Sequence, residues 1–119
     1  MAGLFIYAQS AEMNCVITYS AITSQKGSSK YKTSGTKEKG NTKLTLNIKK
    51  TDGFVSDGST KNKLFVVGKG IGTFYLIERT QSGNMNLYTL FDDNTLTVSK
   101  SYDILGMAKI NVHNIYKCK

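Results

Sequence analysis

The stretch AKINVHNIYKC (residues 108–118) decides the fold class of this chain. Its apolar residues recur at every second position from Ala108 to Val112, and the same face continues to Tyr116 and Cys118. Such alternation is typical of a β-strand that has one buried face and one face in water. We therefore predict a strand near the end of the chain whose apolar face ends at a cysteine.

The same signal recurs along most of the sequence. Two further stretches alternate in the same way: KLTLNIKK (43–50) and NTLTVSKS (94–101). Four more are β-branched and aromatic runs of strand length: CVITYSAI (15–22), KLFVV (63–67), GTFYLIE (72–78) and NMNLYTLF (84–91). Turn-forming residues separate the runs: Asp52-Gly53, Asp57-Gly58, Gly68-Lys69-Gly70, Ser82-Gly83-Asn84 and Asp92-Asp93-Asn94. Turns spaced by about 8–12 residues predict an all-β fold, a single small antiparallel β-barrel or meander of about seven to eight strands, with a β-sandwich as the alternative.

Length and composition fit one domain. The chain has 119 residues, of which 39% are hydrophobic, and this is enough for one core. No run approaches the roughly 20 apolar residues that a transmembrane helix needs.

Residues 1–11 contain a short apolar run followed by small residues at positions 8 and 10, a pattern that is typical of a signal-peptidase cleavage site. We interpret them as a signal-peptide remnant or an N-terminal extension, and residues 12–119 as the β domain. A periplasmic or secreted location is predicted, with a cytoplasmic one as the alternative.

The two cysteines lie near opposite ends of the sequence, at Cys15 and Cys118. Neither belongs to a C-x-x-C pair, and the single histidine, His113, does not complete a zinc site with two thiols. Free buried thiols and one disulfide are the two remaining interpretations. Export would favour the disulfide, because oxidising compartments preserve such bonds.

One segment interrupts the strand pattern. Residues 24–43, SQKGSSKYKTSGTKEKGNTK, are almost wholly polar around one aromatic, Tyr31, and contribute strongly to the net charge of +8. We predict a long loop or an exposed hairpin, which is either merely solvated or binds an anionic partner. The candidate anion-binding residues are Lys26, Lys30, Lys32, Lys37, Lys39 and Lys43. Nucleic acid is not favoured as the partner, because Arg79 is the only arginine.

Motifs that would carry chemistry are not found. Gly68, Gly70 and Gly72 lack the spacing and the following helix of a dinucleotide site. The carboxylates of FDDNT (91–95) lack the alternating ligands of a calcium loop. His113 is predicted to be exposed. We therefore predict no catalytic residue, no metal site and no cofactor.

The stretch from Gly72 to Leu90, with Cys118 near the end of the chain, resembles a group of small exported bacterial β-proteins of unknown function. These carry an I-x-R-x-S/T-G step between strands and end in a cysteine that pairs with one near the mature N-terminus. GTFYLIERTQSGNMNLYTL (72–90) shows this step with one extra residue. The residues that carry the resemblance are Ile77, Arg79, Ser82, Gly83 and Cys118. The resemblance implies export, an all-β fold and a disulfide, but no activity.

Together these observations predict an exported, non-catalytic binding module whose lysine-rich segment holds an anionic polymer or an acidic protein. The anionic partner would be a polysaccharide, a lipid headgroup or an acidic protein surface. Two alternatives remain: a small lipocalin-like carrier of an apolar ligand, and an OB-like binder of single-stranded nucleic acid.

Overall fold

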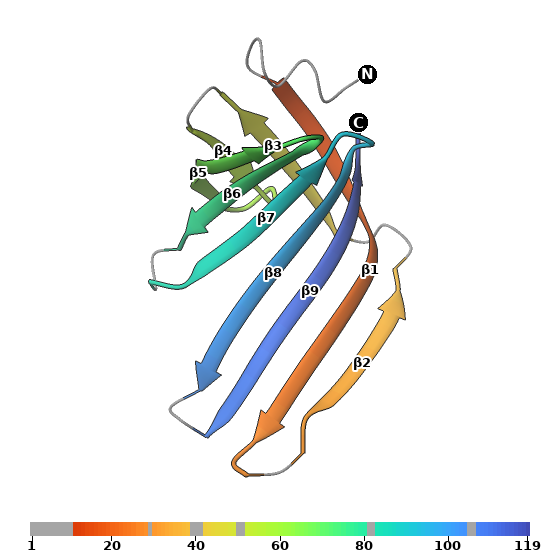
Figure 1. Cartoon of the computed structure of the whole chain (residues 1–119), viewed down its shortest axis with the longest axis vertical. Helices are drawn as coiled ribbons and strands as arrows, with labels where there is room; N and C mark the ends of the chain where they lie inside the picture. The colour runs from red at the N-terminus through yellow and green to blue at the C-terminus, as the bar shows by residue number, and fades with distance from the viewer. Residues whose placement is uncertain (1–10, 29, 39–41, 50–51, 81–82, 105–106) are drawn as a thin grey trace.

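The computed structural model is an all-β structure (Figure 1). It describes residues 11–28, 30–38, 42–49, 52–80, 83–104 and 107–119. Nine strands run through these ranges: β1 (Ala11–Lys26), β2 (Lys32–Lys37), β3 (Lys43–Ile48), β4 (Asp52–Ser56), β5 (Lys61–Gly70), β6 (Thr73–Arg79), β7 (Met85–Phe91), β8 (Thr95–Ile104) and β9 (Ala108–Cys118). The described ranges contain no helix, and therefore none that could span a bilayer.

Eight of the strands close into an antiparallel barrel. The strand order is β2-β1-β3-β4-β5-β6-β7-β8-β9, and an additional pairing of β1 with β9 closes the ring around all strands except β2. The predicted small β-barrel is thus confirmed. Closure leaves the ring without free edges, which is how small β-proteins avoid edge-to-edge association.

The long strand β1 makes this closure. One of its edges pairs with β9 from Cys15 to Lys26. The other edge is shared by two strands, because residues 11–16 pair with β3 and residues 19–24 pair with β2. β2 is therefore an additional strand that follows the barrel wall beyond β3.

The interior of the barrel is filled by the alternating apolar side chains that the sequence pattern predicts. They come from β1 and from every strand from β3 to β9 and include Met13, Ile17, Leu46, Ile48, Val55, Leu64, Phe74, Leu76, Tyr88, Leu90, Leu96, Val98 and Tyr116. Fully burying one such side chain stabilises a fold by about 1.5–3 kcal/mol, so this cluster is the main source of stability.

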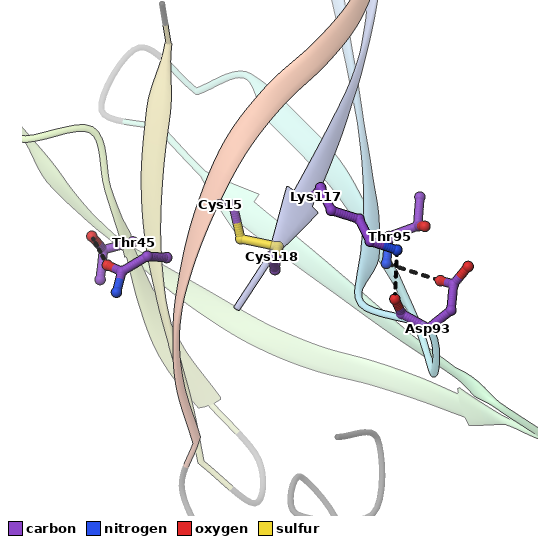
Figure 2. Close-up of a disulfide and its surroundings, with 7 residues drawn as sticks. Cys15, Thr45, Asp93, Thr95, Lys117 and Cys118 are labelled. Carbon is purple, nitrogen blue, oxygen red and sulfur yellow. Dashed lines mark hydrogen bonds between the residues drawn. A yellow bond between two sulfur atoms is a disulfide. The ribbon is translucent and has the colours of Figure 1, made fainter. Parts of the chain in front are cut away.

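Cys15 and Cys118 form a disulfide within this core (Figure 2). They are directly opposite each other in the β1–β9 ladder and are separated by 103 positions in the sequence. Beside them the backbones of Asn14 and Lys119 exchange two hydrogen bonds of 3.0 and 2.9 Å. The disulfide interpretation is confirmed, and the bond lies on the seam where the barrel closes.

Four strands continue past one end of the barrel (Figure 1). The pairing of β7 with β8 ends at Lys100, whereas β8 continues beside β9 to Ile104. The second halves of β1 and β9 and the whole of β2 accompany it. We call this four-stranded sheet the strand extension, and we call the face that continues the barrel interior its inner face.

Two of the predicted turns are wrong. Gly53 lies within β4 and is buried, because the backbone carbonyl of Asn47 lies where a side chain would be. Gly68-Lys69-Gly70 belongs to β5, and the turn follows at Gly72, whose φ is 75°. In neither case does glycine interrupt the strand, and at Gly53 it permits close packing against a neighbouring backbone.

The remaining turn assignments that the structure describes are confirmed. Asp57-Gly58 lies between β4 and β5, and Gly58 has a φ of 100°. Asp92-Asp93-Asn94 lies between β7 and β8, with Asn94 at a φ of 68°. The backbone N–H of Thr95 donates to Asp93 at 2.9 Å (Figure 2) and lowers the pKa of that carboxyl. In the third turn Gly83 has a φ of 91°, while Ser82 is outside the described residues.

The lysine-rich segment is an exposed hairpin in those parts that the structure describes. Residues 24–26 complete β1, and all six residues of β2 are exposed. Of residues 1–11, in which we predicted a signal remnant or extension, only Ala11 is described, and it begins β1.

Candidate functional site

The six lysines predicted to bind anions do not share one surface. Residues opposite each other in an antiparallel ladder lie on the same face of the sheet, so the register assigns the strand lysines to faces. Lys26 and Lys32 lie on the inner face, and Lys37 and Lys43 lie on the outer face. Lys30 lies in the connection between β1 and β2, and Lys39 is outside the described residues.

The inner face of the strand extension combines lysines with apolar side chains. The buried residue Val98 fixes the phase of β8, so Lys100 and Tyr102 follow it on the same face. Two neighbouring rows of side chains then cross the strands in the order β8, β9, β1 and β2. The first row is Lys100, Val112, Ile22 and Ser34, and the second is Tyr102, Ile110, Ser24 and Lys32. Every position of both rows is described, and none is acidic.

The two rows form a solvent-accessible surface. Ile22 and Tyr102 keep 45% and 37% of their surface exposed, and Ile110 and Val112 are half-buried. An apolar strip with positive charges at its borders suits a partner that is anionic and partly apolar. We call this surface the inner strip.

A polar cluster lies in the barrel where the strand extension begins. Glu78 is only 5% exposed and accepts three hydrogen bonds from neutral groups. Asn62 Nδ2 donates to Oε2 at 2.6 Å, and Asn86 Nδ2 and the Tyr88 hydroxyl donate to Oε1 at 2.8 and 2.7 Å. Burial, together with the charge of Glu78, raises the pKa of Tyr88, so that the phenol remains a hydrogen-bond donor.

A cavity of about 180 Å³ opens above this cluster. Its rim includes Asp57, Thr60, Lys100 and Tyr102, so it adjoins the inner strip through two shared residues. Asp57 accepts hydrogen bonds from the backbone N–H groups of Thr60 and Ser59, each at 2.9 Å, and from both hydroxyls. These bonds hold the pKa of Asp57 well below its usual range, and the bond from the Thr60 backbone has the largest effect. We call this cavity the mouth pocket.

A second exposed apolar area lies on the outside of the barrel. Phe65, Ile77 and Leu87 are neighbours across β5, β6 and β7 on the outer face, and Val67 and Met85 lie beside them. Val67, Met85 and Leu87 each expose about half of their surface, at 54%, 53% and 45%. Patches of this kind mark interaction surfaces when they are contiguous.

The aromatic residues are divided between the interior and the surface. Phe74, Tyr88 and Tyr116 are buried in the packed interior, whereas Tyr75 is 40% exposed on the outer face. Tyr88 is therefore not available for stacking on a base. His113 lies on the outer face, opposite Ser99, and is half-buried, more than the exposed position predicted for it.

Sequence reasoning missed Glu78 and Asn86, although a signal for both was present. In β6, Glu78 continues the inward alternation of Phe74 and Leu76, and in β7 Asn86 precedes Tyr88 in the same phase. A polar residue in an apolar phase is either paired or functional. Among the described residues, no group of histidine, cysteine, aspartate and glutamate side chains could hold a metal ion.

We compared the chain with protein-family models, with curated proteins and with solved structures, and none of the three comparisons found a match.

Proposed function

We propose that this protein is an exported, non-catalytic binding module that holds an anionic polymer, such as an acidic polysaccharide, on the inner strip. The observation that carries the proposal is the register of β8, β9, β1 and β2. It gathers Lys32 and Lys100 around the half-exposed apolar centre of Ile22 and Ile110 and adds no acid. Lys26 extends the same face toward the end of the extension.

Charge supports the same partner class. The chain has 16 basic and 8 acidic residues, so long-range attraction favours polyanions. Lysine provides a point charge, whereas arginine provides a planar fork of donors. A surface that carries lysines therefore suits repeated anionic groups better than the edges of bases. The Cys15–Cys118 disulfide supports export, because such bonds persist in oxidising compartments.

The test uses matched pairs of lysines on opposite faces. One variant carries Lys26→Gln and Lys32→Gln on the inner face, and the control carries Lys37→Gln and Lys43→Gln on the outer face. All four lysines are exposed and all come from the same segment. Both variants therefore lose the same charge, and thermal melting of each checks that it remains folded.

Heparin is the probe, measured by titration calorimetry at several salt concentrations. We expect the inner-face variant to bind about 5- to 30-fold more weakly, at about 0.5–1 kcal/mol for each lysine contact, and the control to bind nearly as wild type. Equal weakening of both variants would show that net charge alone attracts the polymer. Unchanged binding by the inner-face variant would refute the proposal.

A further inference from the structure

The mouth pocket contains a buried carboxylate without a cation. Glu78 is 5% exposed, and its three hydrogen-bond donors are two amides and a phenol. Among the described residues Glu78 forms no ion pair, although Lys100 lines the same cavity. Proteins usually pair a buried charge, because removing it from water is costly.

The amide of Asn86 provides a second and independent observation. Its Nδ2 donates to Glu78 at 2.8 Å, which fixes the orientation of the amide. The other end, Oδ1, is buried and accepts no hydrogen bond from any described residue. Buried amide oxygens nearly always have a partner. Asn86 is itself 5% exposed and lines the mouth pocket.

The two observations define the chemistry that the pocket lacks. A carboxylate offers about four acceptor positions, of which the three donors use three, and the amide oxygen offers further ones. Asn86 Oδ1 therefore lacks a donor, and Glu78 lacks a paired cation among the described residues. A primary ammonium group supplies both, since it has three N–H donors, one charge and no acceptor.

The size of the cavity limits what carries this group. About 180 Å³ corresponds to roughly six water molecules, well below the roughly 300–1,000 Å³ of a drug-sized site. A short alkyl chain with a charged end fits this space. Asp57 on the rim adds a second negative charge and disfavours anions.

We propose that the mouth pocket binds a primary ammonium group on a short alkyl chain, as in a free alkylamine or a lysine side chain. The groups that would hold the ammonium, Glu78 and Asn86, lie outside the inner strip, although the two sites share Lys100 and Tyr102, and the pocket attracts the opposite sign of charge. It therefore does not depend on the function proposed above.

The test is a titration of ¹⁵N-labelled protein followed by NMR at constant ionic strength. The probes are butylammonium chloride, the neutral isostere 1-butanol, sodium butyrate, and Nα-acetyl-lysine methylamide. We expect butylammonium to shift the side-chain amide signals of Asn62 and Asn86 with saturation, and butanol and butyrate to bind at least about tenfold more weakly. Binding of the lysine derivative as tightly as butylammonium would identify a lysine side chain as a ligand, and weaker binding would identify free amines. Equal responses to butylammonium and butanol would overturn the proposal.

Three variants locate the site. Glu78→Gln removes the buried charge and should weaken butylammonium binding by about tenfold. Because that change also alters the core, we add two variants at the rim of the pocket, which should change the affinity for butylammonium in opposite directions. Asp57→Asn, which keeps the acceptor of the turn, should weaken binding about threefold, and Lys100→Gln should strengthen it about threefold. Glu12→Gln, at an exposed position outside the pocket, is the control and should change nothing. Wild-type binding by both rim variants would refute the assignment.

Discussion

Reduction of the Cys15–Cys118 bond should remove a large part of the stability of this protein without changing its fold. The bond closes a loop of 103 positions in a chain of 119 residues. In the unfolded state it therefore restricts nearly the whole chain. In the folded state the β1–β9 ladder holds the two strands together by backbone hydrogen bonds, whether or not the sulfur atoms are linked.

The size of the effect follows from the length of this loop. The chain-entropy relation gives about 4.7 kcal/mol at 25 °C for a loop of about 100 residues. An unfolding entropy of about 2.1 cal/mol/K per residue gives about 250 cal/mol/K for the chain. Dividing the first value by the second predicts that Tm falls by about 19 °C on reduction.

The assay compares oxidised and fully reduced wild-type protein by urea unfolding and by thermal melting. Complete reduction is verified by alkylation and mass measurement. Reduction keeps both sulfur atoms in the core, so the comparison isolates the covalent link from packing. The double variant Cys15→Ala, Cys118→Ala controls for the reductant, which should not affect it.

Two outcomes would contradict this reasoning. A difference in unfolding free energy below about 1 kcal/mol would show that the unfolded chain gains little freedom when the bond opens. Loss of the barrel on reduction would show that the hydrogen-bonded ladder does not close the sheet by itself.

Two further predictions concern buried positions. Tyr88→Phe removes a donor from Glu78 and should lower the unfolding free energy by about 1.5–3 kcal/mol near neutral pH. The raised pKa of Tyr88 implies stability that is present below pH of about 10, where the unfolded phenol ionises, and is lost above it. The stability gap between wild type and the phenylalanine variant should therefore narrow in urea titrations above pH of about 10; a gap that widens there would contradict the assignment. Gly53→Ala places a methyl group against the Asn47 carbonyl and should cost about 1–3 kcal/mol by urea unfolding, whereas Gly68→Ala in β5 meets only ordinary contacts and should stay within about 0.5 kcal/mol. Equal effects of the two glycine substitutions would contradict the packing argument.

Side-chain alternation made most of the strands predictable. In β9 and in β3 the apolar positions follow the two-residue period of a strand, and the structure places both where the sequence indicates. The turn predictions at Gly53 and Gly68 were wrong, because glycine occurs both in turns and within strands. Gly72 is required in a turn, where its φ is positive. Gly53 is required within a strand, because a side chain there would meet the backbone of Asn47. Local sequence does not distinguish these two uses.

The candidate sites were harder to predict, because they depend on which strands are neighbours. The inner strip joins residues from opposite ends of the chain, such as Ile22 and Val112, and no local pattern links them. Lysine content drew attention to residues 24–43. It did not show that Lys32 and Lys37 would lie on opposite faces of one strand.

A single irregularity in β1 connects the barrel with the strand extension. The β1–β9 register shifts between Ile17 and Tyr19, so one extra residue of β1 lies between two consecutive pairs. Before the shift the odd positions face inward, as Ile17 does, and after it the even positions do, as Ile22 does. Without the shift Tyr19 would face inward and Ile22 would face outward. The bulge therefore explains why the inward positions of CVITYSAI change from Cys15 and Ile17 to Ser20 and Ile22. It also decides which side chains of β1 lie on the inner strip.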